Sequence, residues 1–151
     1  MEYRIVRSIL FVVPGREIDH FQAETIIRYT EGLLRQQCFR LLVFDLADTV
    51  FMDSAGVGMM IGLYREIRAW GGAVYIIRMQ SGVRRIYRMA GLHKIIPCYE
   101  GEAQFLAAVE GGGSVTFTLA PRDGYRVEDM KLFVNGREQV LADGDNGEKI
   151  C

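Results

Sequence analysis

The chain has 151 residues, the length of one ordinary domain, and half of its residues are hydrophobic. Its 18 basic and 19 acidic side chains give a net charge of −1, which argues against direct binding to nucleic acid or to anionic lipid. This composition also excludes a disordered or fibrous chain. The longest apolar run, at about residues 57–64, is far shorter than the roughly 20 residues that cross a bilayer.

The cysteines indicate a reducing compartment. Cys38, Cys98 and Cys151 are odd in number, lie far apart and form no CxxC pair, so we expect free thiols. The apolar run at residues 9–13 is too short for a signal-peptide core, so we expect a cytoplasmic protein. Because no His, Cys and Asp residues share metal-ligand spacing, we expect neither a bound metal nor a cofactor.

The first elements along the chain are two short strands and a helix. Residues 3–6 and 9–13 are apolar segments of strand length, and Pro14-Gly15 ends the second. From Ala23 the apolar residues recur at spacings of three and four, which predicts a helix with one buried face. That face comprises Ala23, Ile27, Thr30, Leu34 and Cys38.

The middle of the chain predicts a buried strand followed by a long helix. Residues 41–46 form a continuous apolar run, as in a strand covered on both faces, and the helix spans about residues 54–70. Gly71-Gly72 is a typical stop signal. The predicted inward stripe of this helix is Val57, Met60, Ile61, Tyr64 and Ile67. Outside it lie Met59, Leu63 and Trp70, which fit either a second core layer or an interface.

The remaining elements complete an α/β pattern. Residues 73–77 predict another buried strand, 82–89 a short helix that ends at Gly91, 95–97 a short edge strand, and 102–109 a last helix. Strands that alternate with helices predict parallel neighbours joined by right-handed crossovers. The adjacent strands at the N-terminus should make the sheet mixed.

The glycine run Gly111-Gly112-Gly113 is the clearest candidate for a linker. We therefore expect a domain at 1–113 and a C-terminal extension at 114–151. The extension contains strand-like segments at 115–119, 130–134 and 137–141, the last two around an Asn-Gly turn. The sequence leaves open whether it is a small β appendage, a partner-specific extension or a poorly ordered end.

The most informative segment lies between the buried strand and the long helix, at residues 51–58. Asp53 and Ser54 are residue types that cap a helix start, and a helix start favours an anion nearby. Glycines follow at 56, 58 and 62, so the segment presents one hydroxyl in uncrowded surroundings. Two simpler interpretations remain: the cap of a buried helix, or a nucleotide-binding glycine pattern, although the spacing matches neither GxGxxG nor a P-loop.

Several segments of the chain together form a recognisable set. They are Gly15-Arg16-Glu17-Ile18-Asp19-His20, Ala23-Glu24, Leu42-Val43-Phe44-Asp45-Leu46, Phe51-Met52-Asp53-Ser54-Ala55-Gly56-Val57-Gly58, Gly71-Gly72, 73–78, Ser81-Gly82-Val83-Arg84-Arg85 and Met89-Ala90-Gly91-Leu92. This set resembles the STAS domain of bacterial anti-sigma factor antagonists, over about residues 2–110, and the form of residues 15–24 is most similar to the sporulation branch. The resemblance implies a mixed, mostly parallel sheet of about four or five strands packed by about four helices.

The resemblance also implies a binding protein that is switched by phosphorylation, and not an enzyme. The switch serine of the family falls on Ser54, with Asp19 and Asp53 at acidic positions beside it. In such proteins the unphosphorylated form binds an anti-sigma factor that is also a serine kinase, and the sigma factor is released. Phosphorylation ends the complex and a separate serine phosphatase resets it. The chain would then be a positive regulator of sigma-dependent transcription.

The partner surface expected from these residues has two parts. Ala55, Gly56 and Gly58 would let a partner approach Ser54 closely. Arg84 and Arg85, which crowd one short helix with Arg88, form either a solvated face or a docking surface for an acidic partner.

Three alternative functions can be weighed against this one. A STAS domain can be a regulatory or scaffold subunit of a transporter or a stress-sensing complex, and the glycines at 56–62 could belong to a nucleotide-binding module. A hydrolase built on Ser54, His20 and Asp53 is disfavoured because the GxSxG elbow is missing. We expect His20 in a turn and His93 in a loop.

Overall fold

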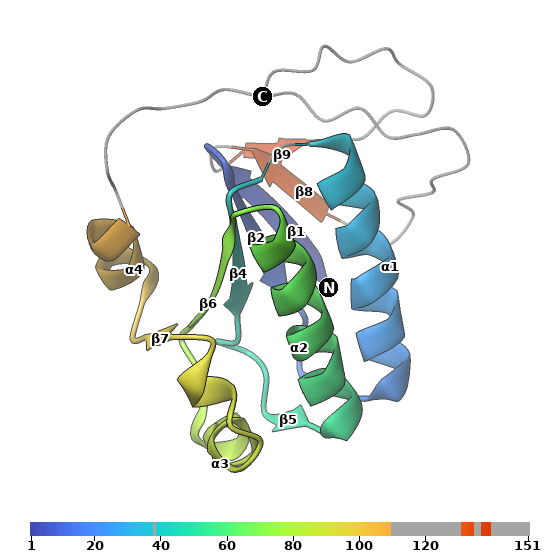
Figure 1. Ribbon diagram of the computed structural model, residues 1–151, viewed down its shortest axis with the longest axis vertical. Coiled ribbons are helices and arrows are strands. Elements are labelled where there is room, and N and C mark those ends of the chain that lie inside the picture. Colours follow the sequence, from blue (N-terminus) through green and yellow to red (C-terminus); the bar gives the residue numbers. More distant parts are fainter. Residues whose placement is uncertain (38, 110–130, 135–136, 140–151) are drawn as a thin grey trace.

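The computed structural model describes residues 1–37, 39–109, 131–134 and 137–139 (Figure 1). One mixed sheet has the strand order β7-β6-β4-β2-β1-β8-β9, in which β1–β2 and β8–β9 are antiparallel and the other neighbours are parallel. This confirms the predicted mixed, mostly parallel sheet. Its strands are β1 (Glu2–Val6), β2 (Ile9–Val13), β4 (Leu41–Asp45), β6 (Ala73–Ile77), β7 (Cys98–Tyr99), β8 (Lys131–Val134) and β9 (Arg137–Gln139).

In the part of the chain that the structure describes, four α-helices pack around the sheet. The long helices α1 (His20–Gln36) and α2 (Ser54–Ala69) run side by side over one face, and the short α4 (Glu102–Val109) packs on the other (Figure 1). Helix α3 (Ser81–Met89) and the 3-10 turn η1 (Leu92–Lys94) lie beyond the carboxyl end of β6. Two very short strands, β3 (Glu17–Ile18) and β5 (Phe51–Met52), form a separate parallel pair.

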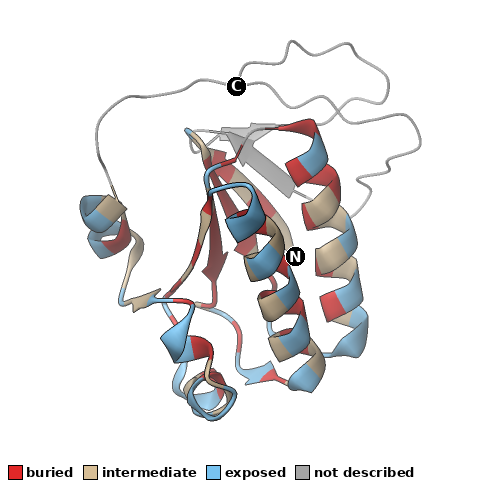
Figure 2. Cartoon of the chain, in the orientation of Figure 1, coloured by how far each residue is buried: buried red, intermediate tan, exposed pale blue. Residues whose placement is uncertain are grey.

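The hydrophobic core is divided by the sheet, because successive side chains of a strand point to opposite faces. One face of the strands packs against α1 and α2, and the other contributes to a smaller cluster with Phe105 of α4. Figure 2 shows the buried strands between helices whose outer surfaces are exposed. Strand β4 is buried on both faces over most of its length, as predicted.

Helix α2 is rotated from its predicted orientation. Its buried residues are Gly56, Met59, Met60, Leu63 and Ile67, whereas Val57, Ile61 and Tyr64 are only half-buried. The prediction was wrong because apolar residues surround much of this helix, and its contacts with α1, β6 and β5 decide which stripe faces inward. Met59 and Leu63 therefore belong to the core, while Trp70 is 56% exposed.

Two further predicted boundaries were wrong. Helix α1 begins at His20 and not at Ala23, because Asp19 caps it, so His20 is not a turn residue. Residues 95–97 form no strand; the pairing with β6 is made by Cys98–Tyr99. Pro97 has no N–H to donate, although its carbonyl accepts a bond from the Ile76 N–H at 2.9 Å.

The C-terminal strands extend the sheet at β1. Strand β8 pairs in parallel with β1, from Glu2↔Lys131 to Ile5↔Val134, and β9 pairs with β8. The predicted strand at 115–119, the linker Gly111–Gly113, the Asn135-Gly136 turn, and Cys38 and Cys151 lie outside the described residues. The domain boundary at 113 therefore stays a prediction. Among the residues that the structure describes, no helix has the length and hydropathy to span a membrane.

Candidate functional site

The starts of α1 and α2 lie side by side because the strands that precede them are paired. Strands β3 and β5 align Glu17 with Phe51 and Ile18 with Met52. The Asp53 N–H donates to the Ile18 carbonyl at 3.2 Å, which continues this contact. Both strands lead directly into aspartates and then into helices. The two predicted acidic positions, Asp19 and Asp53, are therefore brought to the same end of the molecule.

Each aspartate caps its helix. The Oδ1 atom of Asp19 accepts a hydrogen bond from the Gln22 N–H at 2.8 Å. The same atom of Asp53 accepts bonds from the N–H groups of Ala55 at 2.8 Å and Gly56 at 3.2 Å. These bonds satisfy N–H groups that the first helical turn leaves unpaired. The predicted cap is confirmed, and it leaves Ser54 available.

Ser54 is the first residue of α2 and is exposed. Its hydroxyl makes no hydrogen bond within the described part of the chain, because Asp53 performs the capping. Two parallel helices direct their positive ends toward this region. The arrangement presents one hydroxyl at the surface, where an attached phosphate would lie at a helix start.

Apolar side chains flank Ser54, and we call Phe21, Val50 and Phe51 the apolar rim. They are 74%, 47% and 49% exposed, so their side chains are available to a partner. These three residues were not predicted from the sequence as parts of the site. A partial signal existed, because Phe51 alternates with the buried Met52 in a two-residue strand.

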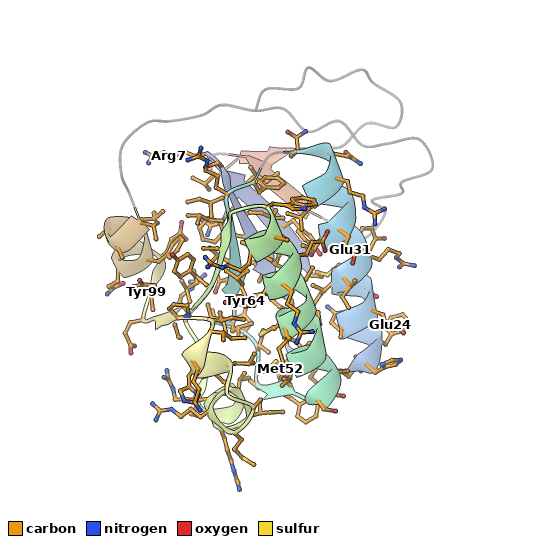
Figure 3. All side chains as sticks on the ribbon, in the orientation of Figure 1. Arg7, Glu24, Glu31, Met52, Tyr64 and Tyr99 are labelled. Carbon is orange, nitrogen blue, oxygen red and sulfur yellow. The ribbon has the colours of Figure 1, made fainter. Side chains whose placement is uncertain are left out.

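The small residues after Ser54 have different surroundings. Gly56 is buried, and a Cβ there would lie 2.5 Å from Met52 Cγ and 2.9 Å from Ile18 Cγ2. Figure 3 shows Met52 beside the first turns of α2. Gly58 is exposed with open space around it, and Ala55 is half-buried. Gly56 thus permits close packing of Met52 and Ile18 against α2, whereas Gly58 leaves the surface of the helix free of a side chain.

Helix α3 adjoins the apolar rim through Gly82, where a Cβ would lie 2.7 Å from the Val50 carbonyl oxygen. Arg84 is half-buried and Arg85 is exposed. Residues 79–99 include Arg84, Arg85, Arg88 and Lys94 but no Asp or Glu, and we call these four the basic α3 surface. Met89 beside them is 75% exposed.

The geometry does not support two of the alternative sites. The His20 Nε2 lies 3.3 Å from Glu24 Oε1, and the described residues show no hydrogen bond between His20 and Ser54. Gly56, Gly58 and Gly62 lie inside α2 and not in a loop, so they form no phosphate-binding turn. No cluster of three potential metal ligands occurs among the described residues. His93 lies in the 3-10 turn η1 and not in a loop as predicted, with its ring against that of Tyr87.

Comparisons of the sequence with known proteins agree on one family. The sequence profile of the STAS domain matches residues 1–105. An anti-sigma F factor antagonist of Paenibacillus polymyxa is 33% identical over 105 residues, which cover 69% of this chain and 89% of the relative.

Solved structures show the same fold. A putative anti-sigma factor antagonist from Thermotoga maritima gives a TM-score of 0.64 at 20% identity, covering 71% of this chain and 92% of that one. The anti-sigma factor antagonist SpoIIAA in its unphosphorylated form gives 0.59 at 21% identity, covering 72% and 94%. Its phosphorylated form, described as a Bacillus cell fate determinant, gives 0.56 at 23% identity, covering 69% and 93%.

Proposed function

Because this chain belongs to the STAS domain family, we propose that it is an anti-sigma factor antagonist controlled by phosphorylation of Ser54. The unphosphorylated form binds an anti-sigma factor that is also a serine kinase, and the sigma factor is released. The exposed, unbonded hydroxyl of Ser54 at the capped start of α2 is the observation that carries this proposal. The anti-sigma factor antagonist of Paenibacillus polymyxa, at 33% identity, supports it.

The switch acts through charge. A phosphoserine carries about −1.5 to −2 charges at neutral pH, and here it would be added beside Asp19 and Asp53. A partner that packs on the apolar rim would then have to desolvate a dense group of negative charges. The helix start tolerates the phosphate, so binding is lost while the domain stays folded.

The partner surface extends from Ser54 in two directions. Near Ser54 the partner meets Phe21, Phe51, Ala55 and Gly58, which suit an apolar surface that approaches closely. Farther along it meets the basic α3 surface, where Arg84 and Arg85 can pair with carboxylates. The expected partner therefore has an apolar contact region with an acidic region next to it.

The remaining parts of the proposal follow from this partner set. A separate serine phosphatase restores the unphosphorylated form, and the chain itself is a binding protein without catalytic activity. It acts in the cytoplasm as a positive regulator of sigma-dependent transcription, of the sporulation type. Residues 1–113 form the STAS domain and 114–151 an extension.

The test is to mix the protein with candidate anti-sigma kinases and ATP and to map the phosphate by mass spectrometry. We expect modification of Ser54 and not of Ser8, Ser81 or Ser114, and none in Ser54→Ala. Phosphate chiefly on another serine would refute the proposal. Binding to a non-kinase scaffold without modification of Ser54 would favour a regulatory subunit of a transporter or stress-sensing complex.

A further inference from the structure

The segment between β4 and α2, residues 46–53, leads directly into Ser54, and we call it the Ser54 loop. One side of this loop is held by the connection between β2 and α1. Thr49 Oγ1 donates to the Gly15 carbonyl at 2.6 Å, and the Val50 N–H donates to the Arg16 carbonyl at 2.8 Å. The hydrogen bond from the Asp53 N–H to the Ile18 carbonyl holds the same side of the loop at its end.

The other side of the loop is held by side chains from the junction of β6 and α3. Asp45 is buried, and its Oδ1 accepts bonds from Arg78 Nε at 3.0 Å and from the Ala47 N–H at 3.2 Å. Arg78 also donates through Nη2 to Asp45 Oδ2. Gln80 Nε2 donates to the Ala47 carbonyl. Both backbone polar groups of Ala47 are thus bound by side chains.

The backbone of Arg78 adopts a left-handed conformation that non-glycine residues rarely take. Its φ is +55°, and only Arg7 shares a positive φ among the described non-glycine residues. Such a backbone costs on the order of 1 kcal/mol and persists where surrounding contacts require it. The hydrogen bond with Asp45 raises the pKa of the Arg78 guanidinium. The contacts at the junction therefore define the position of the loop.

We infer that Arg78 and Gln80 are positioning residues, which hold the Ser54 loop so that the Ser54 hydroxyl is presented to the kinase in one orientation. The inference rests on the proposed function for its consequence, but the loop contacts can be tested in the isolated protein. A displaced nucleophile lowers the rate of group transfer even where partner binding is intact, because the reacting atoms must be aligned. Neither residue needs to touch the kinase.

The chain offers a matched control in Arg4. Its guanidinium binds both carboxylate oxygens of Glu102, at 2.9 and 2.6 Å, and this pair is also partly buried. It joins β1 to α4 on the opposite face of the sheet from α2. Arg4→Met therefore removes a bidentate ion pair of similar chemistry without touching the Ser54 loop.

The experiment compares full-length wild type with Arg78→Met, Arg78→Lys, Gln80→Ala and Arg4→Met. Amide hydrogen exchange across residues 46–53 should accelerate at least about tenfold in Arg78→Met and Gln80→Ala and stay unchanged in Arg4→Met. Arg78→Lys should recover part of the protection, because an ammonium group cannot reproduce the bidentate contact. With the kinase, kcat for Ser54 phosphorylation should fall about tenfold in Arg78→Met while KM changes little.

Three outcomes separate the hypotheses. Equal loop exchange in Arg78→Met and Arg4→Met would overturn the inference, even if both variants were less stable. A loosened loop with unchanged kcat would show that the contacts are structural and have no positioning role. If wild type accepted no phosphate from any partner kinase, the proposed function would fail, while hydrogen exchange would still decide what holds the loop.

Discussion

Asp53 and Ser54 are neighbours with separate tasks. The Asp53 carboxylate binds the N–H groups of Ala55 and Gly56, while the Ser54 side chain is free of bonds to the described residues. A serine at the capping position itself would lose its capping bond on modification. Here the cap remains when the next residue changes, so this end of α2 can be modified without being unfolded.

Substitutions at Ser54 should lower the affinity for the anti-sigma partner in proportion to the negative charge that they add. Ser54→Ala adds neither charge nor bulk, so it should bind like wild type and stay bound in the presence of ATP. Ser54→Asp supplies one negative charge where phosphate supplies nearly two, so its affinity for the partner should lie between those of wild type and the phosphoprotein. Each 1.4 kcal/mol of lost binding free energy corresponds to about a tenfold weaker affinity. Calorimetric titration of the three proteins and the phosphoprotein measures this. Equal affinities for all four would exclude the switch.

Glu66 on α2 should make folding weakly dependent on pH. Burial, and then the nearby Glu31 charge, raise the pKa of Glu66, while Arg35 lowers it. With a folded pKa above the unfolded one, its contribution is fully present below about pH 4 and is lost as pH rises through the folded pKa. Glu66→Gln should therefore raise stability at neutral pH by up to about 0.5 kcal/mol. Thermal unfolding at pH 7 and pH 3.5 tests this; an equal gain at both would contradict it.

Two glycines within the same helix should respond oppositely to one methyl group. At Gly56 an added Cβ meets Met52 and Ile18, so Gly56→Ala should cost about 1–3 kcal/mol through overpacking. At Gly58 nothing lies within 4 Å, so Gly58→Ala should gain up to about 1 kcal/mol from helix propensity. Urea unfolding of the two variants measures the difference. Equal stabilities would mean that β5 is not held closely against α2.

Local sequence patterns predicted the elements better than their contacts. Strand β4 and helix α2 follow from continuous and periodic apolar residues, and the capped serine follows from residue types at a strand–helix boundary. The rotation of α2 did not follow, because apolar residues such as Met59 and Ile61 occupy two neighbouring stripes, and only packing decides between them. The start of α1 was placed too late because His20, Phe21 and Gln22 do not extend the apolar period.

Contacts between distant residues were beyond prediction from spacing alone. Asp45 and Arg78 are 33 residues apart, and only the parallel pairing of β4 with β6 brings their strand ends together. The approach of the starts of α1 and α2 likewise depends on β3 pairing with β5. A single sequence specifies neither pairing locally. The basic residues of α3 were evident, but the close approach of this helix to Val50 through Gly82 required the structure.

At the scale of the whole molecule, the candidate site and the C-terminal strands occupy different regions. The site forms where β3, β5 and the starts of the long helices meet, whereas β8 and β9 extend the edge at β1. In Figure 3, Arg7, in the turn that follows β1, lies at the end of the molecule opposite Met52. Strands β8 and β9 therefore add to the sheet away from Ser54.

Removal of residues 114–151 should leave a domain that unfolds cooperatively, because the described hydrophobic core comes from residues before 110. The truncated chain would lose β8 and β9, so β1 would become the edge strand. Thermal unfolding followed by circular dichroism tests this. Loss of the transition, or aggregation, would mean that the extension covers core surface and that the boundary at 113 is misplaced.

The pairing of β1 with β8 also sets an order of assembly. Glu2 and Lys131 are partners although they lie 129 positions apart along the chain. Strand β2, by contrast, follows β1 after a two-residue turn. Since closing a longer loop costs more entropy, β1 should join β2 early and β8 only after the rest of the sheet exists. The main refolding rate of the full chain should then match that of residues 1–113, with the last two strands docking in a separate, later step.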